Sequence, residues 1–297
     1  MAELALDTLP RRYDGNDTQQ QPLILVSNDD GIYSPGLHAV VRAVCDLGQV
    51  FVAAPRQQYS NAGRSYAAAH IQNTDARLEH LPVDCPQVIA YSLAGSPAQA
   101  VMRAIVELVP RLPDLLISGI NYGENMGAGV TVSGTIGAAI EGACARIPGL
   151  AVSLQTPHEY HYKPGTDVDF SVAAAFTRKF AQLVLAHRLP PDVDVLKIDV
   201  PATATIDSPW RLTRISRQQY YATIPRRKLS PDSDEEVDYE VRIDIPSLEP
   251  DSDIHAMAVD GVVSVSPLSI DLSSRVDRRA TEARMRRSLQ EMERVRE

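Results

Sequence analysis

The chain has 297 residues, of which 44% are hydrophobic, and these values are typical of a globular protein with one large domain or two modest ones. Its formal net charge of -9 at pH 7 argues against a general role in binding nucleic acid. The segment 1–21 is polar and lacks the apolar core of a secretory signal, and no stretch reads as a membrane span. We therefore expect a cytoplasmic protein whose partners include no nucleic acid and no membrane.

The three cysteines, Cys45, Cys85 and Cys144, lie far apart in the sequence and lack the spacing of a metal site. Their odd number and wide separation are typical of small buried residues in a reducing compartment. This interpretation agrees with the expected cytoplasmic location.

The N-terminal part of the chain alternates predicted strands with predicted helices. A buried strand begins at Leu23 and runs into the acidic turn 28–31, after which Ser34-Pro35 begins a helix that Gly48 ends. Further strands are predicted at residues 50–53, 88–93, 115–118, 150–154 and 195–201, and further helices after Ser96-Pro97, at 136–145 and at 172–187. This alternation predicts an α/β fold with a mostly parallel sheet and right-handed crossovers.

The pattern changes beyond Pro201. Strands of hairpins are predicted at residues 211–215, 241–245 and 262–265, with an acidic loop at 232–238 between them. We predict a polar tail at 1–21, one α/β domain at 22–274 and a charged helix or tail at 275–297. Within that domain the core covers about 22–200 and a hairpin extension about 201–274. Hairpins with little core of their own need a partner surface, so we expect a homo-oligomer.

Oxygen-bearing side chains follow three of the predicted strands. Asp29 and Asp30 come directly after the first strand, Ser60 lies in the loop after the second, and Asn121 lies in the glycine-rich loop after the central one. These strand ends meet at the carboxyl edge of a parallel sheet. Adjacent carboxylates repel each other unless a cation lies between them, and these donors suit Mg²⁺ or Mn²⁺ better than Zn²⁺. The alternative is that the acidic pair forms only a turn and a helix cap.

The sequence Ser133-Gly134-Thr135 opens a predicted helix of small residues. The first backbone N–H groups of a helix are unpaired and lie at the positive end of its dipole, so they can bind an anion. Gly134 would let the anion approach the backbone, and the two hydroxyls could donate hydrogen bonds. A metal beside an anion pocket indicates phosphate ester chemistry. The alternative is that these residues form only a helix cap.

These motifs, in this order, resemble the SurE survival-protein family. They are Ser27-Asn28-Asp29-Asp30-Gly31, Ala54-Pro55 with Ser60, Ser118-Gly119-Ile120-Asn121 with Gly123 and Asn125, and Ser133-Gly134-Thr135. The resemblance is strong over about 23–154 and weaker at 197–201 and 260–268. It implies a Rossmann-like, mostly parallel sheet flanked by helices, with C-terminal β-hairpins exchanged between subunits of a homodimer or homotetramer.

The same resemblance implies a metal-dependent phosphatase that converts nucleoside 5′-monophosphates, and also 3′-monophosphates, to nucleoside and phosphate. It implies one divalent cation per subunit, Mg²⁺ or Mn²⁺, held by Asp29, Asp30, Ser60 and Asn121. It places the substrate phosphate at Asn125, Ser133, Gly134 and Thr135. Asp29 and Asp30 would be the catalytic residues, with Asp29 acting either as a base or as a direct nucleophile.

Two other classes of protein share parts of this pattern. A signalling receiver module also has an acidic pair after its first strand, but it needs a phosphoacceptor aspartate where this chain has Ser118-Gly119. A dinucleotide-binding oxidoreductase needs a Gly-x-Gly-x-x-Gly turn after the first strand. The acidic turn 28–31 would instead put negative charge where a pyrophosphate must bind. Both classes therefore fit the sequence less well than a phosphatase.

Overall fold

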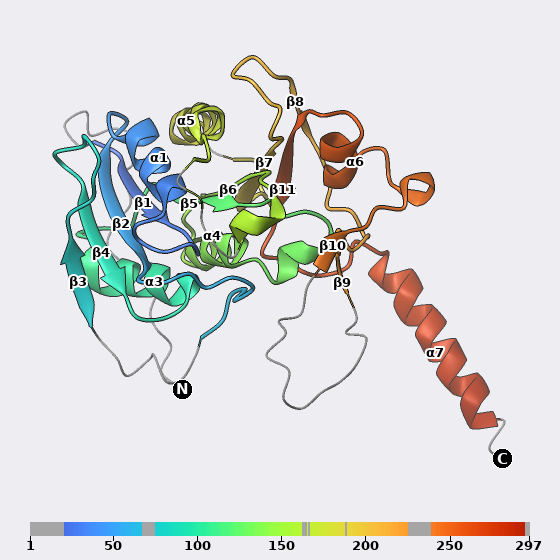
Figure 1. The fold of residues 1–297 in the computed structure, drawn as a ribbon. Coiled ribbons are helices and arrows are strands. Elements are labelled where there is room, and N and C mark those ends of the chain that lie inside the picture. The colour runs from blue at the N-terminus through green and yellow to red at the C-terminus, as the bar shows by residue number, and fades with distance from the viewer. Residues whose placement is uncertain are drawn as a thin grey trace, which may run out of the picture.

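A computed structural model of the protein describes residues 21–66, 75–161, 165, 167–187, 189–224 and 239–294. These residues contain a nine-stranded, mostly parallel sheet with helices on both faces, together with a separate two-stranded sheet (Figure 1). The predicted α/β class with a Rossmann-like core is therefore confirmed. The predicted polar tail lies outside the described residues apart from Gln21, and so does the acidic loop 232–238.

The large sheet has the strand order β3-β4-β2-β1-β5-β6-β7-β11-β8. Its strands are β1 (Leu23–Ser27), β2 (Gln49–Pro55), β3 (Ala76–Glu79), β4 (Ile89–Leu93), β5 (Leu115–Tyr122), β6 (Gly149–Leu154), β7 (Val195–Val200), β8 (Trp210–Leu212) and β11 (Val263–Leu268). Strand β1 pairs in parallel with β2 on one side and with β5 on the other. The order of connection reverses there, and ligands of open α/β sheets bind in the crevice at such a point.

Helices cover the sheet in two layers. Helices α1 (Pro35–Val44) and α5 (Ser171–Ala186) pack on one face, while α3 (Pro97–Arg103) and α4 (Gly134–Cys144) pack on the other (Figure 1). Alternate residues of β1 enter different cores, since Ile24 belongs to one hydrophobic cluster and Leu25 to the other. Because both faces of β1 are buried, its register is fixed, and so is the position of the acidic turn that follows it.

The helix starts agree with the Ser-Pro signals in the sequence. Ser96 forms a capping box with Gln99 at the start of α3, and a five-residue π-helix (Ala104–Leu108) continues that helix. Ser133 caps α4 by accepting a hydrogen bond from the backbone N–H of Ile136 at 3.2 Å. These local signals predict helix starts well because the cap and the N–H groups that it satisfies lie within one turn.

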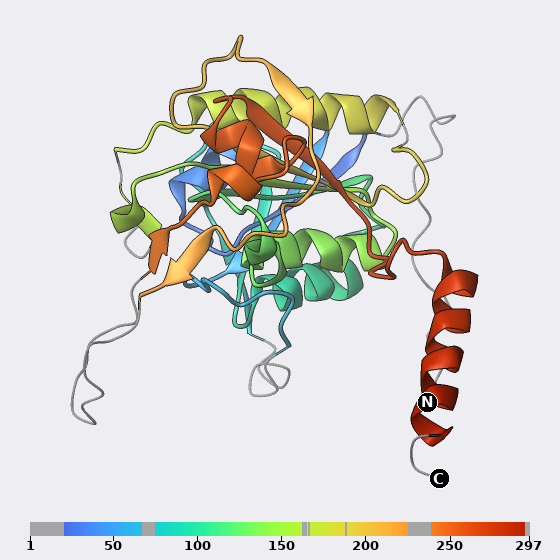
Figure 2. The same ribbon diagram turned by 90° about the vertical axis from the view of Figure 1, so that its right-hand side faces the viewer.

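The region after β7 differs in part from the hairpins predicted there. Strands β9 (Tyr221–Thr223) and β10 (Tyr239–Val241) do form an antiparallel pair. Strand β11 instead joins the large sheet, antiparallel to β7 and parallel to β8. The short helix α6 (Asp253–Ala258) was not predicted, because six residues are too few to show a helical period. Helix α7 (Arg278–Arg294) projects from the rest of the molecule, as the charged C-terminal sequence predicts (Figure 2).

The interpretation of the cysteines as buried thiols is wrong. Cys45, just after α1, and Cys85, in the loop before β4, form a disulfide across a Cα–Cα distance of 5.9 Å. Cys144 has no disulfide partner and is exposed. Spacing along the chain could not reveal the pair because the fold, not the sequence separation of 40 residues, brings the two Cα atoms together. Among the described residues, no helix combines the length and the apolar character that crossing a membrane requires.

Candidate active site

A cavity of about 520 Å³ lies at the carboxyl edge of the sheet, where β1 and β5 end. Most of the predicted site residues line it: Asp29, Asp30, Ser60, Asn121, Asn125 and Ser133. Three loops that are remote in sequence therefore meet at the switch point of the sheet, as the strand-end argument predicts. Gly134 and Thr135 do not line the cavity and lie behind Asp29 instead.

The carboxylate of Asp29 lies at the N-terminus of α4. The hydroxyl of Thr135 donates a hydrogen bond of 2.6 Å to its Oδ1 atom. A Cβ atom at Gly134 would lie only 2.7 Å from the Cβ of Asp29, so the close approach depends on glycine there. The positive end of the helix dipole thus faces a carboxylate of the protein itself. A phosphate role for Gly134 and Thr135 stays a prediction, and the structure adds that both residues hold Asp29 in place.

Burial affects the charges of both aspartates. It raises the pKa of Asp29 to about 6, against the opposing effect of the Thr135 hydrogen bond. Burial, and then the charge of Asp29, raise the pKa of Asp30 well above its usual range. The backbone N–H of Tyr122 and the side chain of Gln58 bond to Asp30 at 3.4 and 3.2 Å, which offsets part of that effect. The two carboxylates therefore resist ionising together unless a cation compensates them.

The side chain of Asn121 is oriented for a cation. Its Nδ2 group donates to the backbone carbonyls of Tyr122 and Gly123, at 3.1 and 2.7 Å, so its Oδ1 atom remains as the acceptor. With the two aspartates and the exposed Ser60 hydroxyl, this makes a set of oxygen donors that fits a hard divalent cation. No cluster of three His, Cys, Asp or Glu side chains suited to a metal occurs in the described part of the chain. A metal here would therefore depend on the neutral donors Ser60 and Asn121 as well.

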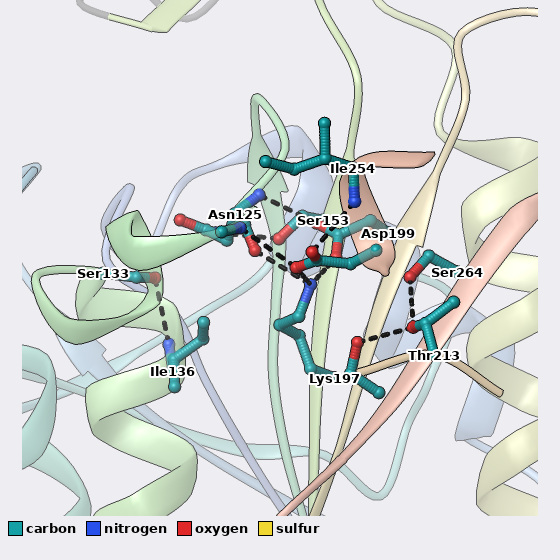
Figure 3. A network of polar contacts seen from close by, with 12 residues as sticks. Asn125, Ser133, Ile136, Ser153, Lys197, Asp199, Thr213, Ile254 and Ser264 are labelled. Carbon is teal, nitrogen blue, oxygen red and sulfur yellow. Dashed lines mark hydrogen bonds and ion pairs between the residues drawn. The ribbon is translucent and has the colours of Figure 1, made fainter. Parts of the chain in front are cut away.

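Residues of the neighbouring strands fix Asn125 from three directions (Figure 3). Its backbone N–H donates to Asp199 Oδ1 at 2.8 Å, and its Nδ2 group donates to the hydroxyl of Ser153 at 2.9 Å. Its carbonyl oxygen accepts a hydrogen bond from Lys197 Nζ at 2.9 Å. The amide is thus held in one orientation, with its Oδ1 atom and its second N–H left for a ligand.

Lys197 connects this loop to the C-terminal part of the chain. Its side chain is fully buried and forms ion pairs with Asp199 and, at 3.2 Å, with Asp253. Asp253, the first residue of α6, also accepts the backbone N–H of Gly127 at 3.0 Å. Burial opposes the charge of Lys197, but the two carboxylates outweigh it and raise the pKa of its ammonium group.

Sequence reasoning missed this buried network. The only local signal was Lys197 and Asp199 at alternate positions of a strand, where side chains share a face of the sheet. A charged pair in that arrangement usually indicates a solvated face. Here β7 is the last strand of the parallel part of the sheet, and β11 pairs with its outer edge. Asp253 then completes the network from a segment that the sequence could not place.

Comparisons with known proteins agree with this geometry. Residues 24–222 match the family described as Survival protein SurE. The chain is 40% identical over 260 residues to the 5'-nucleotidase SurE of Thermococcus gammatolerans, covering 86% of this chain and 92% of that protein. The 5'-nucleotidase SurE of Archaeoglobus fulgidus is 37% identical over 255 residues, which cover 86% of this chain and 94% of that protein. The crystal structure of the SurE protein from Aquifex aeolicus matches with a TM-score of 0.67 and 26% identity, covering 85% of this chain and 95% of that one.

Proposed function

Because this chain belongs to the SurE survival-protein family, we propose that it is a metal-dependent phosphatase that hydrolyses nucleoside 5′-monophosphates to nucleoside and inorganic phosphate. One observation supports this proposal above the others. Asp29, Asp30 and Asn121 present oxygen atoms to one cavity, and the phosphate-binding candidates Asn125 and Ser133 line the same cavity. Neither a receiver module nor a dinucleotide-binding oxidoreductase requires that combination.

The proposed metal ligands are Asp29, Asp30, Ser60 and Asn121, with one Mg²⁺ or Mn²⁺ ion per subunit. When bound, such an ion would polarise a phosphoryl oxygen and make a water molecule more acidic. The residues fit the ion because two buried carboxylates lack a positive side chain between them among the residues described. We keep both roles for Asp29 open, as the general base for an attacking water or as the nucleophile.

The phosphate-binding part of the proposal rests on Asn125, Ser133 and the start of α4, including the backbone of Gly134 and Thr135. The Asn125 amide is held in a fixed orientation, so it can donate to a phosphoryl oxygen without having to reorganise. The positive end of the α4 dipole stabilises negative charge in the same region. Together these groups would stabilise the charge that develops on the phosphoryl oxygens.

The direct test is the release of inorganic phosphate from AMP, GMP, CMP and UMP by the purified protein, with Mg²⁺ or Mn²⁺ and with excess chelator. We expect release that depends on the metal. 3′-AMP in the same panel would show whether the site also accepts 3′-monophosphates. If no nucleotide yields phosphate with either metal, the proposed function is wrong.

Added metal is expected to stabilise the protein more at about pH 7.5 than at about pH 5. The raised pKa of Asp29, about 6, means that the folded apo protein holds a proton that the unfolded chain releases near pH 3.8. Its contribution to stability is therefore present at low pH and is lost as the pH rises through 6, where the ionised Asp29 is left buried without a counter-ion. A bound cation would neutralise the buried carboxylate and so restore the lost stability. At about pH 5, protons compete with the cation for the carboxylates, so the metal should stabilise the protein less.

Thermal unfolding with Mn²⁺ and with chelator, at both pH values, measures this effect. The double substitution Asp29→Asn with Asp30→Asn should abolish the metal-induced shift in Tm at both pH values. A shift of equal size at the two pH values in the unchanged protein would contradict the prediction, because the aspartates would then not be the groups that bind the ion.

We also propose a homodimer or homotetramer. Helix α7 carries an apolar stripe of Met285, Leu289 and Met292, whose exposed fractions are 62%, 59% and 57%. An apolar stripe on a projecting helix is stabilised by a partner surface, and a second copy of the chain would supply one (Figure 2). Light scattering on the full chain should give the mass of a dimer or tetramer, and a monomeric mass would contradict this proposal.

The cytoplasm is the location that we propose. The acidic composition and the nucleoside monophosphate substrate support it. The Cys45–Cys85 disulfide is the observation against it, because disulfides are rare in cytosolic proteins. The predicted division into a core at about 22–200, an extension at about 201–274 and a charged segment at 275–297 likewise stays a prediction.

A further inference from the structure

The loop that follows β2 carries Ser60 to the cavity and is held on both sides of that residue. Before Ser60, the backbone N–H of Tyr59 donates to the carbonyl oxygen of Asp29 at 2.7 Å. After it, the chain turns at Asn61, whose φ of 59° lies in the left-handed region that asparagine tolerates better than most residues. Ser60 itself is exposed and lines the cavity. Its position therefore depends on how the flanking parts of the loop are held.

The part of the loop after Asn61 lies directly against α4. A Cβ atom at Gly137, in the second turn of that helix, would lie only 2.4 Å from the carbonyl carbon of Gly63 and 2.7 Å from the nitrogen of Arg64. The backbone N–H of Gly63 also donates to the carbonyl oxygen of Val132, just before the helix, at 2.8 Å. The two backbones are thus in contact, which the missing side chain of Gly137 allows.

Glu141, one turn after Gly137 on α4, accepts hydrogen bonds from two side chains of the loop. Arg64 Nε donates to its Oε2 atom at 2.6 Å, and the Tyr66 hydroxyl donates to its Oε1 atom at 2.5 Å. Glu141 is only 8% exposed, whereas Arg64 and Tyr66 are both exposed. Because a buried carboxylate is destabilising unless its oxygens are paired, this arrangement favours the conformation in which the loop lies against α4.

Helix α4 therefore contacts two of the proposed metal ligands by different means. Its first turn holds the carboxylate of Asp29 through the hydroxyl of Thr135. Its later turns hold the loop that carries Ser60. A helix is a rigid element, so it can set the separation between a serine hydroxyl and a carboxylate that come from different strand ends.

We propose that Glu141 is a positioning residue of the metal site, which holds the loop against α4 and so keeps the Ser60 hydroxyl beside the two aspartates. This inference rests on the proposed function, because it takes Ser60 to be a metal ligand. Glu141 does not line the cavity, so it acts through Ser60 and not as a ligand itself. Groups that orient a metal ligand in this way typically contribute about 10–100-fold to metal affinity.

The first test measures the Kd for Mn²⁺ by calorimetry on the full chain after its metal has been removed with chelator. Glu141→Ala should raise that Kd about tenfold, because the loop loses both hydrogen bonds. Glu141→Gln keeps one acceptor oxygen and should raise it less. An unchanged Kd in Glu141→Ala would overturn the inference, whereas absence of Mn²⁺ binding by the unchanged protein would contradict the proposed metal site and with it the proposed function.

A second measurement separates positioning of Ser60 from a general effect on the fold. Ser60→Ala should raise the Kd for Mn²⁺ by about the same factor as Glu141→Ala. If Glu141 acts through Ser60, adding Glu141→Ala to Ser60→Ala should change the Kd by less than about twofold. Effects of the two substitutions that multiply in full would overturn the inference, because Glu141 would then act on the metal independently of Ser60.

Two further variants control for stability. Glu107→Ala removes another glutamate that pairs with an arginine, Arg103 at 2.6 Å, and that lies outside the cavity lining, so the Kd should stay within about twofold. Tyr66→Phe breaks one of the two hydrogen bonds from the side of the loop and leaves Glu141 in place. It should raise the Kd about threefold, half of the tenfold effect on a logarithmic scale. If Glu141→Ala does not fold in chelator, an unchanged Kd in both Tyr66→Phe and Glu141→Gln would overturn the inference.

Discussion

Replacing Asp29 by asparagine is expected to lower metal-dependent phosphate release by roughly a thousandfold or more while the fold remains intact. Asparagine keeps an oxygen that can accept the hydrogen bond from Thr135, and it has nearly the same shape. It removes the charge that we propose binds the cation and, in either proposed role, the group that would act on the phosphoryl centre. The measurement is the initial rate of phosphate release from AMP at saturating Mn²⁺.

The stability of the same variant separates loss of function from loss of fold. Burial disfavours the ionised form of Asp29, so the neutral amide should leave Tm in chelator unchanged or raised at about pH 7.5. Asp84→Asn is the matched control, since Asp84 is exposed and lies outside the cavity lining. A rate for Asp29→Asn close to that of the control would remove Asp29 from the mechanism.

Replacing Lys197 by methionine is expected to lower the free energy of unfolding by about 3–5 kcal/mol, because it breaks a buried ion pair from one side. Methionine fills most of the space of the lysine stem, so the loss comes from charge. The carboxylates of Asp199 and Asp253 would both remain buried without their counter-ion. Urea unfolding of the variant and of the unchanged protein measures the difference.

Two further variants give this prediction its controls. Lys179→Met removes an exposed lysine of α5 that lies 5.7 Å from the ring centroid of Phe176, and it should cost less than about 1 kcal/mol. Adding Asp199→Asn to Lys197→Met should recover part of the loss, because one of the two unpaired charges is then gone. A loss below about 1 kcal/mol for Lys197→Met alone would show that the network contributes little.

Local patterns in the sequence were enough to predict most of the sheet and much of the site. The apolar run before Asp29 predicts β1, and the Ser-Pro and Ser-Gly-Thr signals predict the starts of three helices. Each of these signals lies within one element, where periodicity and capping act. The convergence of Asp29, Ser60 and Asn121 also follows from the sequence, because parallel strands end at the same edge of a sheet.

Contacts between distant segments were the part that sequence could not supply. The hydrogen bond from Thr135 to Asp29 shows why Thr135 points away from the cavity, and it depends on how α4 packs against β5 and β6. The link between Lys197 and Asp253 depends on the placement of α6. The Cys45–Cys85 disulfide depends on the loop before β4. The hydrophobic periodicity of a segment does not indicate which remote segments it will contact, because those contacts are decided by the packing of the whole fold.

The ion pair between Lys197 and Asp253 also bears on when the protein becomes active during its synthesis. A growing polypeptide contains both aspartates of the proposed metal site and the whole of the loop at 125–127 long before the ribosome adds Asp253. Until α6 joins, the N–H of Gly127 lacks its acceptor and Lys197 lacks one of its two counter-ions. In an incomplete chain on the ribosome, the loop proposed to bind phosphate would therefore be held less firmly, and we expect activity on nucleotides only after α6 is in place.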